Sequence, residues 1–539
     1  MRARTVFILL TVTVLALVAS VVVAPPVAAP AGGRGFSAVP LRHAALDALR
    51  AHGKALRVPF PNSVNKGRKF VPGGELVPAL ATDATQPVIV LFVKFADDPP
   101  GGPATRLDLG TYFDSMLFGD TYDPPEYAEF ADYPTDRTLF NYYRAVSYGK
   151  VSVVTYDKPS ELGWVQLANT YEYYCQGDNG FGAYPHNAPR LVEDAIAAVD
   201  AAVDFSKYAI NGVVPNLFVV HAGTGAEWNG DPNIIWSHSW SLSSGTPLTK
   251  GYKTDDGVVI DNYAMMPEVG GDLTGWTGSI YGPFPPTVGV YAHEYGHVLG
   301  LPDQYDYGYE SEGTGIYSLM AGGSWNQWPG DWIFSGNSPS FLDAWSRYRL
   351  GFVTPTVIDS LTNVTLPPAE EQPTVFKMVV PFSGGKEYFL LENRQQIGFD
   401  QGLNVYGVPS GETVRGLAIY HIDDVVLSRN YWRPNEAENW KEFRSEGAAR
   451  AWTGERHYGI SLIQADDRWD LEHGNYGWFR SDLYPGSYGV TAFGSFTLPN
   501  SSSYYFWAGN APKFGYSGVT VENITENAGT VKATLRFVK

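Results

Sequence analysis

The stretch that decides the fold runs from Tyr291 to Asp303 and has the sequence YAHEYGHVLGLPD. It contains the pattern His-Glu-x-x-His-x-x-Gly-x-x-Asp. On a helix, His293 and His297 are roughly 40° apart around the axis and about 6 Å apart along it, so both imidazoles lie on one face and can bind one ion. Glu294 is about 100° from His293, which places it beside the ion as a general base for metal-bound water. The stretch therefore predicts a catalytic zinc site.

The residues after the second histidine predict how this site is completed. Gly300 ends the helix where a left-handed residue is needed, and Pro302 prevents the helix from resuming. The chain can then turn and bring Asp303 back to the ion, which gives the two histidines and one carboxylate of a catalytic zinc site, with a position left for water. The alternative third ligand is a glutamate on a second helix, but Glu310 and Glu312 stand in a glycine-rich predicted loop. We therefore expect Asp303 to be the third ligand.

Composition limits the classes of protein and partner. The chain has 539 residues, too many for one compact core, and its 44% hydrophobic and 17% charged residues indicate folded domains. A net charge of −18 argues against nucleic acid and against an anionic membrane surface as partners. The single cysteine, Cys175, excludes an internal disulfide, and no neighbouring residue supplies the paired base of a catalytic cysteine.

The N-terminus has the layout of a secretory signal. Arg2 and Arg4 precede an apolar run from Val6 to Ala24, and prolines and small residues follow. We predict a signal peptide over residues 1–30 and a secreted protein, with an uncleaved membrane anchor as the alternative because the run is long. No later segment has eighteen unbroken apolar residues, so we expect no stable membrane association.

Residues 31–85 contain one short helical pattern, over residues 41–56, and coil rich in Pro and Gly. A weakly structured segment between a signal and an enzyme is where a propeptide belongs, so we predict one here; a mere N-terminal extension is the alternative. The segment has no cysteine, which excludes a cysteine-based latency switch. If an acid on the zinc maintains latency, the candidates are Asp47, Glu75 and Asp83.

Between residues 86 and 352, short buried strands alternate with amphipathic helices, which indicates a mixed sheet backed by helices. The predicted strands include residues 87–95, 150–154, 217–220 and 258–265. The predicted helices are residues 138–147, 187–203, 287–299 and 341–350, the last opened by Ser338-Pro339 and ended by Gly351. The strand over residues 258–265 is also a candidate edge on which an extended substrate adds as a further strand.

From residue 353 to residue 539 the pattern changes to short β-type runs separated by Gly, Pro, Asn and Asp. Examples are residues 376–380, 388–391, 417–420 and 531–538. This spacing predicts an all-β sandwich or barrel, so we place a domain boundary near residue 353. One loop-rich stretch carries oxygen ligands suited to calcium, although an acidic surface loop explains them equally well: Asp466, Asp467, Asp470, Glu472, Asn475 and Asp482.

Downstream of the zinc motif, residues 316–322 predict a tight turn that places Met320 beneath the zinc ligands. The extended motif followed by this turn resembles the metzincin metallopeptidases, with aspartate in place of their usual third histidine. More narrowly, the chain is similar to the secreted bacterial peptidases related to immune inhibitor A. The matching stretches are His293 to Asp306, Tyr317 to Met320, Gly323 to Trp325, Tyr142 to Lys150, Trp236 to His238, Phe389 to Arg394, Tyr420 to Asp423 and Asp482 to Gly486.

The resemblance implies an α+β metzincin-like catalytic domain over residues 86–352 and an all-β sandwich-like accessory domain over residues 353–539. It implies a secreted zinc endopeptidase made as a zymogen, with one catalytic zinc, structural calcium, and protein or peptide substrates. The roles it implies are zinc ligand for His293, His297 and Asp303, general base for Glu294, and turn residue for Met320. We expect a monomer.

A second reading belongs to a different class of protein. The chain would then be an exported adhesion or glycan-binding protein whose peptidase half has lost activity, and the 14% aromatic share could line a sugar-binding face. The intact base and the complete ligand set count against this reading. Three other single histidines near β-type runs, for which we expect structural roles, are His221, His238 and His421.

Overall fold

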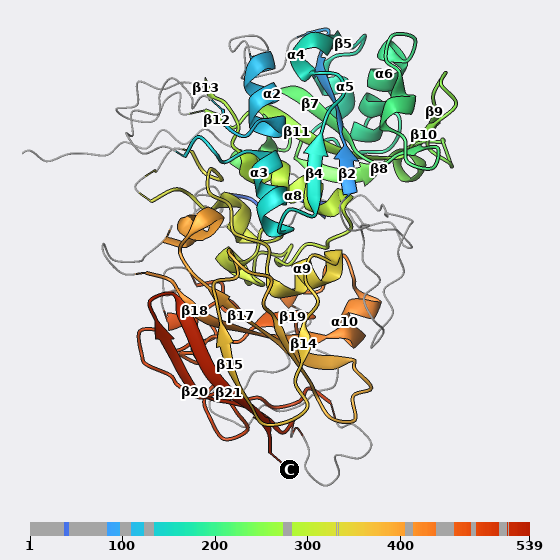
Figure 1. Cartoon of the computed structure of the whole chain (residues 1–539). Coiled ribbons are helices and arrows are strands. Elements are labelled where there is room, and N and C mark those ends of the chain that lie inside the picture. Colours follow the sequence, from blue (N-terminus) through green and yellow to red (C-terminus); the bar gives the residue numbers. More distant parts are fainter. Residues whose placement is uncertain are drawn as a thin grey trace, which may run out of the picture.

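The structure, a computed structural model, describes most of the chain (Figure 1). The described residues are 37–42, 84–97, 109–122, 134–272, 283–329, 331, 334–404, 413–437, 457–475, 481–505, 515 and 517–538. The predicted signal peptide with its alternative, the membrane anchor, lies outside them, as do most of the predicted propeptide and the latency candidates Asp47, Glu75 and Asp83. Within the described ranges, no helix has the length and apolar character needed to cross a membrane.

A six-stranded mixed sheet forms the centre of the N-terminal part of the chain. Four neighbouring strands, β5, β3, β7 and β11, run parallel to one another, whereas β8 is antiparallel to β11 and β1 is antiparallel to β8. In order across the sheet, the strands are β1 (Ser37–Ala38), β8 (His238–Ser241), β11 (Asn262–Val269), β7 (Leu217–Thr224), β3 (Ile89–Lys94) and β5 (Trp164–Gln166). β7 and β11 are buried along almost their whole length, as expected for strands covered on both faces.

The prediction that residues 258–265 form an edge strand is wrong. The structure divides this stretch between β10 (Val259–Ile260) and β11, and β11 lies between β7 and β8. β8 is therefore the strand nearer the edge, and it pairs in turn with β1. β8 is only four residues long, with the sequence His-Ser-Trp-Ser, so no apolar run marks it in the sequence.

The predicted helices of the N-terminal part are present, with shifted ends. Residues 138–147 form α3 (Leu139–Val146), which the hydroxyl of Thr138 caps by accepting from the nitrogen of Asn141 at 3.1 Å. Residues 187–199 form α6 (Ala188–Val199), and its cap Asn187 accepts from the nitrogen of Arg190 at 2.9 Å. The other helices are α2 (Leu109–Phe118), α4 (Pro159–Leu162), α5 (Tyr171–Cys175), α7 (Leu242–Gly245) and α8 (Val288–Val298).

The last helix of this part, α9 (Ala344–Leu350), begins later than predicted. Its cap is Asp343, whose carboxylate accepts from the nitrogen of Ser346 at 2.9 Å, so Ser338-Pro339 does not open the helix. The helix ends at Gly351 as predicted, because Gly351 adopts a left-handed conformation with φ of 79°.

Smaller elements complete the N-terminal part. Its small sheets contain β2 (Ala84–Pro87) with β4 (Val151–Val154), β6 (Val213–Val214) with β10 and β9 (Tyr252–Lys253), and β12 (Gly271–Asp272) with β13 (Pro283–Phe284). Short 3-10 turns are η1 (Phe205–Tyr208), η2 (Ala226–Trp228), η3 (Gly315–Tyr317) and η4 (Gly322–Trp325).

The C-terminal part contains a five-stranded and a three-stranded sheet. The first is β14 (Thr356–Val357), β16 (Phe376–Val379), β17 (Glu387–Arg394), β18 (Gly416–Asp423) and β19 (Ile460–Leu462). The second is β15 (Thr362–Leu366), β21 (Thr530–Phe537) and β20 (Val519–Asn527). Among the described residues between the strands lie η5 (Gly398–Asn404) and the short helix α10 (Asp424–Arg429).

Strand β17 shows how the two parts of the chain share a core. Side chains alternate along a strand, and Phe389 and Leu391 pack in an apolar cluster with β15, β20 and β21. Tyr388 and Leu390 pack instead in the large cluster that contains α8 and the central sheet. Every residue of β17 is buried as a result. In Figure 1 the C-terminal part lies directly beneath the N-terminal part, with α9 at the junction.

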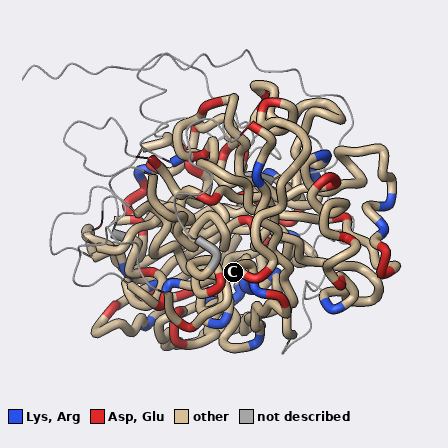
Figure 2. Tube along the Cα trace, turned by 90° about the horizontal axis from the view of Figure 1, so that it is seen from above, with Lys and Arg blue, Asp and Glu red and all other residues tan. Residues whose placement is uncertain are grey.

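Charge is spread over the molecule. Figure 2 shows acidic residues around the whole described trace, interspersed with basic ones. The net charge of −18 therefore does not come from one element.

Candidate metal centre

Helix α8 carries the first two predicted metal ligands in a fully enclosed setting. All its residues from Val288 to His297 are buried. After the helix, Gly300 adopts φ of 100°, and the nitrogen of Leu301 donates to the oxygen of Gly296 at 3.0 Å. This left-handed stop reverses the chain, as the sequence predicts. The reversal brings Asp303 back to the face of α8 that carries the histidines.

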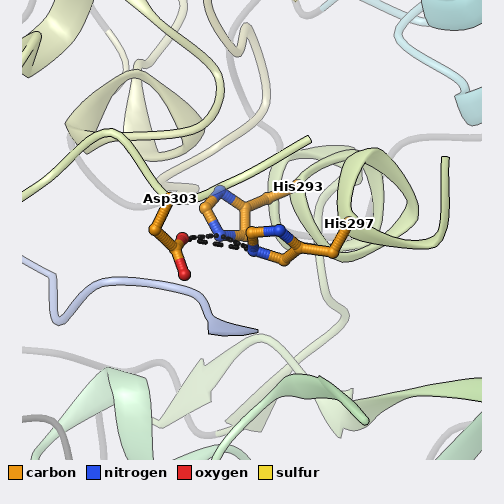
Figure 3. Close-up of side chains that lie close together, drawn as sticks. All are labelled: His293, His297 and Asp303. Carbon is orange, nitrogen blue, oxygen red and sulfur yellow. Dashed lines mark hydrogen bonds and ion pairs between the residues drawn. The ribbon is translucent and has the colours of Figure 1, made fainter. Parts of the chain in front are cut away.

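Three ligand atoms meet beside α8 (Figure 3). The Nε2 atoms of His293 and His297 lie 3.0 Å apart, and each lies 3.1 Å from Oδ1 of Asp303. All three side chains are buried. In the described parts of the chain this is the one group of at least three His, Cys, Asp or Glu side chains whose ligand atoms lie within 4.8 Å of one another. Glu310 and Glu312, the alternative third ligands, do not belong to it.

Hydrogen bonds at the far side of each ring decide which nitrogen faces the group. Nδ1 of His293 lies 2.8 Å from the oxygen of Leu319, and Nδ1 of His297 lies 2.8 Å from the oxygen of Leu301. A carbonyl oxygen only accepts, so each Nδ1 carries the hydrogen, and each neutral ring presents the lone pair of Nε2. Neither Nε2 can then donate to Asp303, whose Oδ1 is buried and accepts no hydrogen bond. Two imidazole lone pairs and a carboxylate oxygen around one point fit a zinc ion.

Asp303 is fixed through its second oxygen. The hydroxyl of Tyr307 donates to Oδ2 of Asp303 in a short hydrogen bond. The ring of Tyr307 stacks on that of Tyr305, with centroids 5.0 Å apart. The sequence analysis missed Tyr307, although Tyr305, Tyr307 and Tyr309 alternate in a way that marks one side of an extended chain.

Glu294 lies next to the group on the same helix. Its side chain is completely buried, and burial raises its pKa well above the usual range, with further increases from the carboxylates of Asp303 and Glu227. Oε2 of Glu294 accepts no hydrogen bond. Oε1 accepts from the main-chain nitrogen of Val39 at 2.8 Å. The position beside the ligands is the one that the helical spacing predicts.

Met320 lies against α8 beneath the histidines. A Cβ atom added to Gly296 would lie only 2.6 Å from Sδ of Met320, so the thioether occupies the space that this glycine leaves open. The main-chain oxygen of Leu319, the residue before Met320, is the one that bonds to Nδ1 of His293. The oxygen of Met320 also accepts from the nitrogen of Gln304 at 2.7 Å. The turn thus contacts both the helix and the loop that carries Asp303.

Residues 37–42 cross this centre, a contact that the sequence analysis missed. β1 pairs antiparallel with β8, and Val39 follows it directly. The indole nitrogen of Trp236 donates to the oxygen of Val39 at 2.8 Å, and that of Trp325 donates to the oxygen of Pro40 at 2.7 Å. In Figure 3 the faint blue ribbon of this segment passes beside the three labelled side chains. Nothing in the local sequence of the segment pairs it with positions some two hundred residues further on.

The segment is also anchored beyond Pro40. The nitrogen of Leu41 donates to the hydroxyl of Tyr309 at 2.8 Å. The nitrogen of Arg42 donates to the oxygen of Glu227 at 3.0 Å, and its guanidinium lies 3.5 Å above the ring of Trp228. Val39 and Leu41 are both buried.

The three single histidines lie away from the metal group. His221 and His238 are on β7 and β8, and burial lowers their pKa values to about 4 and about 3. Nε2 of His421 lies 2.9 Å from Oε1 of Glu387. Cys175 is buried, and burial raises the pKa of its thiol to about 12.

The predicted calcium ligands bond mainly to protein groups. Oδ2 of Asp482 accepts from the hydroxyl of Tyr317, and Oδ2 of Asp466 accepts from that of Ser481. Burial raises the pKa of Asp482, and the nearby carboxylates of Asp466, Asp470 and Glu472 raise it further. Calcium binding here stays a prediction, since the Asp and Glu residues among them do not bring three carboxylate oxygens within 4.8 Å of one another.

Comparison with known proteins identifies the family of the chain. Residues 79–351, more than half of the chain, match the family described as "Immune inhibitor A peptidase M6, catalytic domain". The chain therefore belongs to the immune inhibitor A family of metallopeptidases, as its motifs predict.

Two curated relatives have similar sequences. Immune inhibitor A of Bacillus thuringiensis subsp. alesti is 31% identical over 268 residues, which cover 44% of this chain and 36% of the relative. Pre-pro-metalloprotease PrtV of Vibrio cholerae serotype O1 is 28% identical over 298 residues, which cover 49% of this chain and 30% of the relative. The chain thus spans about a third of the length of these relatives.

Proposed function

We propose that the chain is a zinc-dependent endopeptidase that hydrolyses peptide bonds in proteins. The observation that carries the proposal is the buried group of His293, His297 and Asp303, in which both imidazoles present Nε2 and one carboxylate oxygen has no donor. These three residues are the proposed ligands of one catalytic zinc. When bound, zinc supplies a Lewis acid and lowers the pKa of its water toward roughly 7.

Glu294 is the proposed general base. It is one residue from a ligand, it is shielded from solvent, and its Oε2 has no competing donor. In this role it accepts a proton from the attacking water and passes it to the leaving amine. Met320 is the proposed turn residue beneath the ligands, as in a metzincin-like catalytic domain over residues 86–352, with a β-rich accessory domain after it.

The side of β8 that β1 covers in this structure is the proposed site where a peptide substrate adds. Ser37 and Ala38 already pair with β8 there in antiparallel register, and an unfolded stretch of a substrate protein can make the same main-chain hydrogen bonds. Since this strand excludes a substrate from the same edge, we propose that the chain is a zymogen whose N-terminal segment covers the site. The name of one relative, Pre-pro-metalloprotease PrtV, supports synthesis as a precursor that is later processed. Export by the N-terminal signal, structural calcium and a monomeric state belong to the same proposal.

The test is proteolysis of casein by the purified protein after removal of its N-terminal segment. We expect cleavage that a chelator abolishes and added zinc restores. Glu294→Gln should abolish cleavage while the chain still binds about one zinc, as a single three-ligand site requires. The matched control is Glu310→Gln in the adjacent loop, which should cleave normally. Unchanged cleavage by Glu294→Gln, or cleavage that survives the chelator, contradicts the proposal.

A further inference from the structure

A short segment of the C-terminal part reaches the loop that carries Asp303. It follows α10 and comprises residues 431–436. Its first residue, Tyr431, donates its hydroxyl to the oxygen of Gly300 at 2.7 Å and accepts from Nε of Arg349 at 2.9 Å. Gly300 is the residue at which the chain reverses after α8. One end of the loop is therefore bonded to this segment.

Asn435 bonds to the other end of the loop. Its Nδ2 donates to the oxygen of Gln304, the residue directly after Asp303, at 3.0 Å. The same amide donates to the oxygen of Ile460 at 2.8 Å and accepts from the nitrogen of Ile460 at 3.0 Å. Asn435 is completely buried, so water does not replace these bonds. It ties the main chain beside Asp303 to strand β19.

A third contact reaches the residue that orients the carboxylate. The guanidinium of Arg433 lies 5.7 Å from the ring centre of Tyr307, within the range of a cation–π contact. The hydroxyl of Tyr307 donates to Oδ2 of Asp303. The segment thus contacts the main chain before Asp303, the main chain after it, and the tyrosine that bonds to its carboxylate.

The three ligands differ in how the chain supports them. His293 and His297 stand on a regular helix, whose main-chain hydrogen bonds fix their spacing. Asp303 stands in a stretch without helix or strand, from residue 301 to residue 306. Its place depends on bonds from elsewhere, and metal affinity falls steeply when a ligand is no longer held in its binding geometry.

We propose that Tyr431 and Asn435 are positioning residues for the third metal ligand, so that the C-terminal part completes the metal centre of the N-terminal part. This inference rests on the proposed function in one respect, namely that the group of His293, His297 and Asp303 binds zinc. It deepens that proposal by making an apparently accessory segment part of the site. Neither residue touches the reacting atoms.

The experiment measures the zinc dissociation constant of the full chain by competition with a chelating dye. Tyr431→Phe removes one hydroxyl, and Asn435→Ala removes three hydrogen bonds. We expect each to raise the dissociation constant by roughly 10-fold to 100-fold, the usual effect of losing an outer-shell partner. The visible absorption of the cobalt-substituted protein should change in both, because it reports the ligand geometry directly.

A matched control separates positioning from general destabilisation. Asn393 is also buried; its Nδ2 donates to the oxygens of Leu366 and Gly529, both at 2.8 Å, and its Oδ1 accepts from Gln395 at 2.7 Å. Asn393→Ala therefore loses the same number of bonds as Asn435→Ala, none of them to the loop. It should unfold more easily but keep the wild-type zinc affinity and cobalt spectrum.

The possible results point in different directions. Unchanged zinc affinity and spectra in Tyr431→Phe and Asn435→Ala, or equal losses in Asn393→Ala, overturn the inference. If Asn435→Ala does not fold, Tyr431→Phe decides alone, since it keeps the aromatic ring. If His293→Ala binds zinc as tightly as the wild type, the proposed function is overturned instead. That result is distinguishable from the others.

Discussion

The main-chain nitrogen of Val39 donates to Oε1 of Glu294 at 2.8 Å, although the two residues are 255 positions apart in the chain. The proposed catalytic base is therefore bonded to the segment that also pairs with the edge of the central sheet. Because burial raises the pKa of Glu294 and favours its neutral form, this bond contributes about 0.5–1.5 kcal/mol. The bond both occupies one oxygen of Glu294 and aligns the segment across the proposed substrate edge.

A synthetic peptide of residues 37–42, with the sequence SAVPLR, should inhibit a chain that begins at residue 84. Methylation of the Val39 nitrogen removes the donor to Oε1 of Glu294 and should weaken inhibition by roughly 10-fold, the equivalent of one hydrogen bond of about 1.4 kcal/mol. Inhibition constants measured with a fluorogenic peptide check this. Equal inhibition by the two peptides would show that the bond to Glu294 does not contribute to latency.

Gly296→Ala should destabilise the chain by about 1–3 kcal/mol, because the added methyl overlaps Met320 in a filled core. Urea unfolding of the zinc-free chain measures the loss. The control is Gly308→Ala, whose new methyl would meet nothing closer than 3.5 Å. Combining Gly296→Ala with Met320→Ala should cost less than the sum of the two single changes, since truncation of Met320 makes room. If the losses in free energy of unfolding are additive, the added methyl group does not overlap the side chain of Met320.

Local sequence predicts the metal group well and its surroundings poorly. Helix geometry sets the spacing of the two histidines, and the same eleven residues carry the stop at Gly300 and the return of the chain to Asp303. The strand order is not local: β8 is too short to be recognised, which led to the wrong edge assignment for residues 258–265. The sequence predicts the start of α9 at Ser338-Pro339, because a serine followed by a proline is also typical of a helix N-terminus. In the structure Asp343 is the cap.

The contacts that the sequence did not predict come from distant parts of the chain. Val39 lies in a stretch with little pattern of its own, and Asn435 follows an irregular turn after α10. Each makes its bond through a main-chain or amide group, which no side-chain periodicity reveals. The segment of residues 37–42 beside the metal group and the segment that supports Asp303 therefore emerge only from tertiary packing.

Tyr307→Phe should lower zinc affinity by roughly 10-fold to 100-fold, because Oδ2 of Asp303 loses its donor and the carboxylate its fixed orientation. Dye competition on the chain that begins at residue 84 measures the effect. Tyr309→Phe is the control, because it removes a tyrosine hydroxyl from the same loop, one that bonds to the nitrogen of Leu41 rather than orienting Asp303. A Tyr307→Phe chain with wild-type zinc affinity would show that the bond does not orient the ligand.

Acid should destabilise the fold through His221 on β7, whose pKa burial lowers to about 4 from an ordinary value near 6.5. Between these two values the unfolded chain binds a proton that the folded chain does not, so the free energy of unfolding rises with pH. This contribution is complete above about pH 6.5 and is lost as the pH falls toward about 4. For one such group the slope approaches about 1.4 kcal/mol per pH unit within the window.

His221→Asn tests this dependence, because asparagine does not titrate and its amide can replace the donor to the oxygen of Ala222, which lies 3.0 Å from Nδ1. Urea unfolding of the zinc-free wild type and variant is measured at several pH values from 4.5 to 7.5. The titrating groups distant from His221, including the metal ligands, contribute equally to both proteins and cancel in the difference. His238 is the exception, because the charge of His221 also lowers its pKa. We expect the wild type to lose stability relative to the variant as the pH falls below about 6.5. Parallel curves would mean that His221 is charged in the folded chain as readily as in the unfolded one, and that burial on β7 does not keep its imidazole neutral.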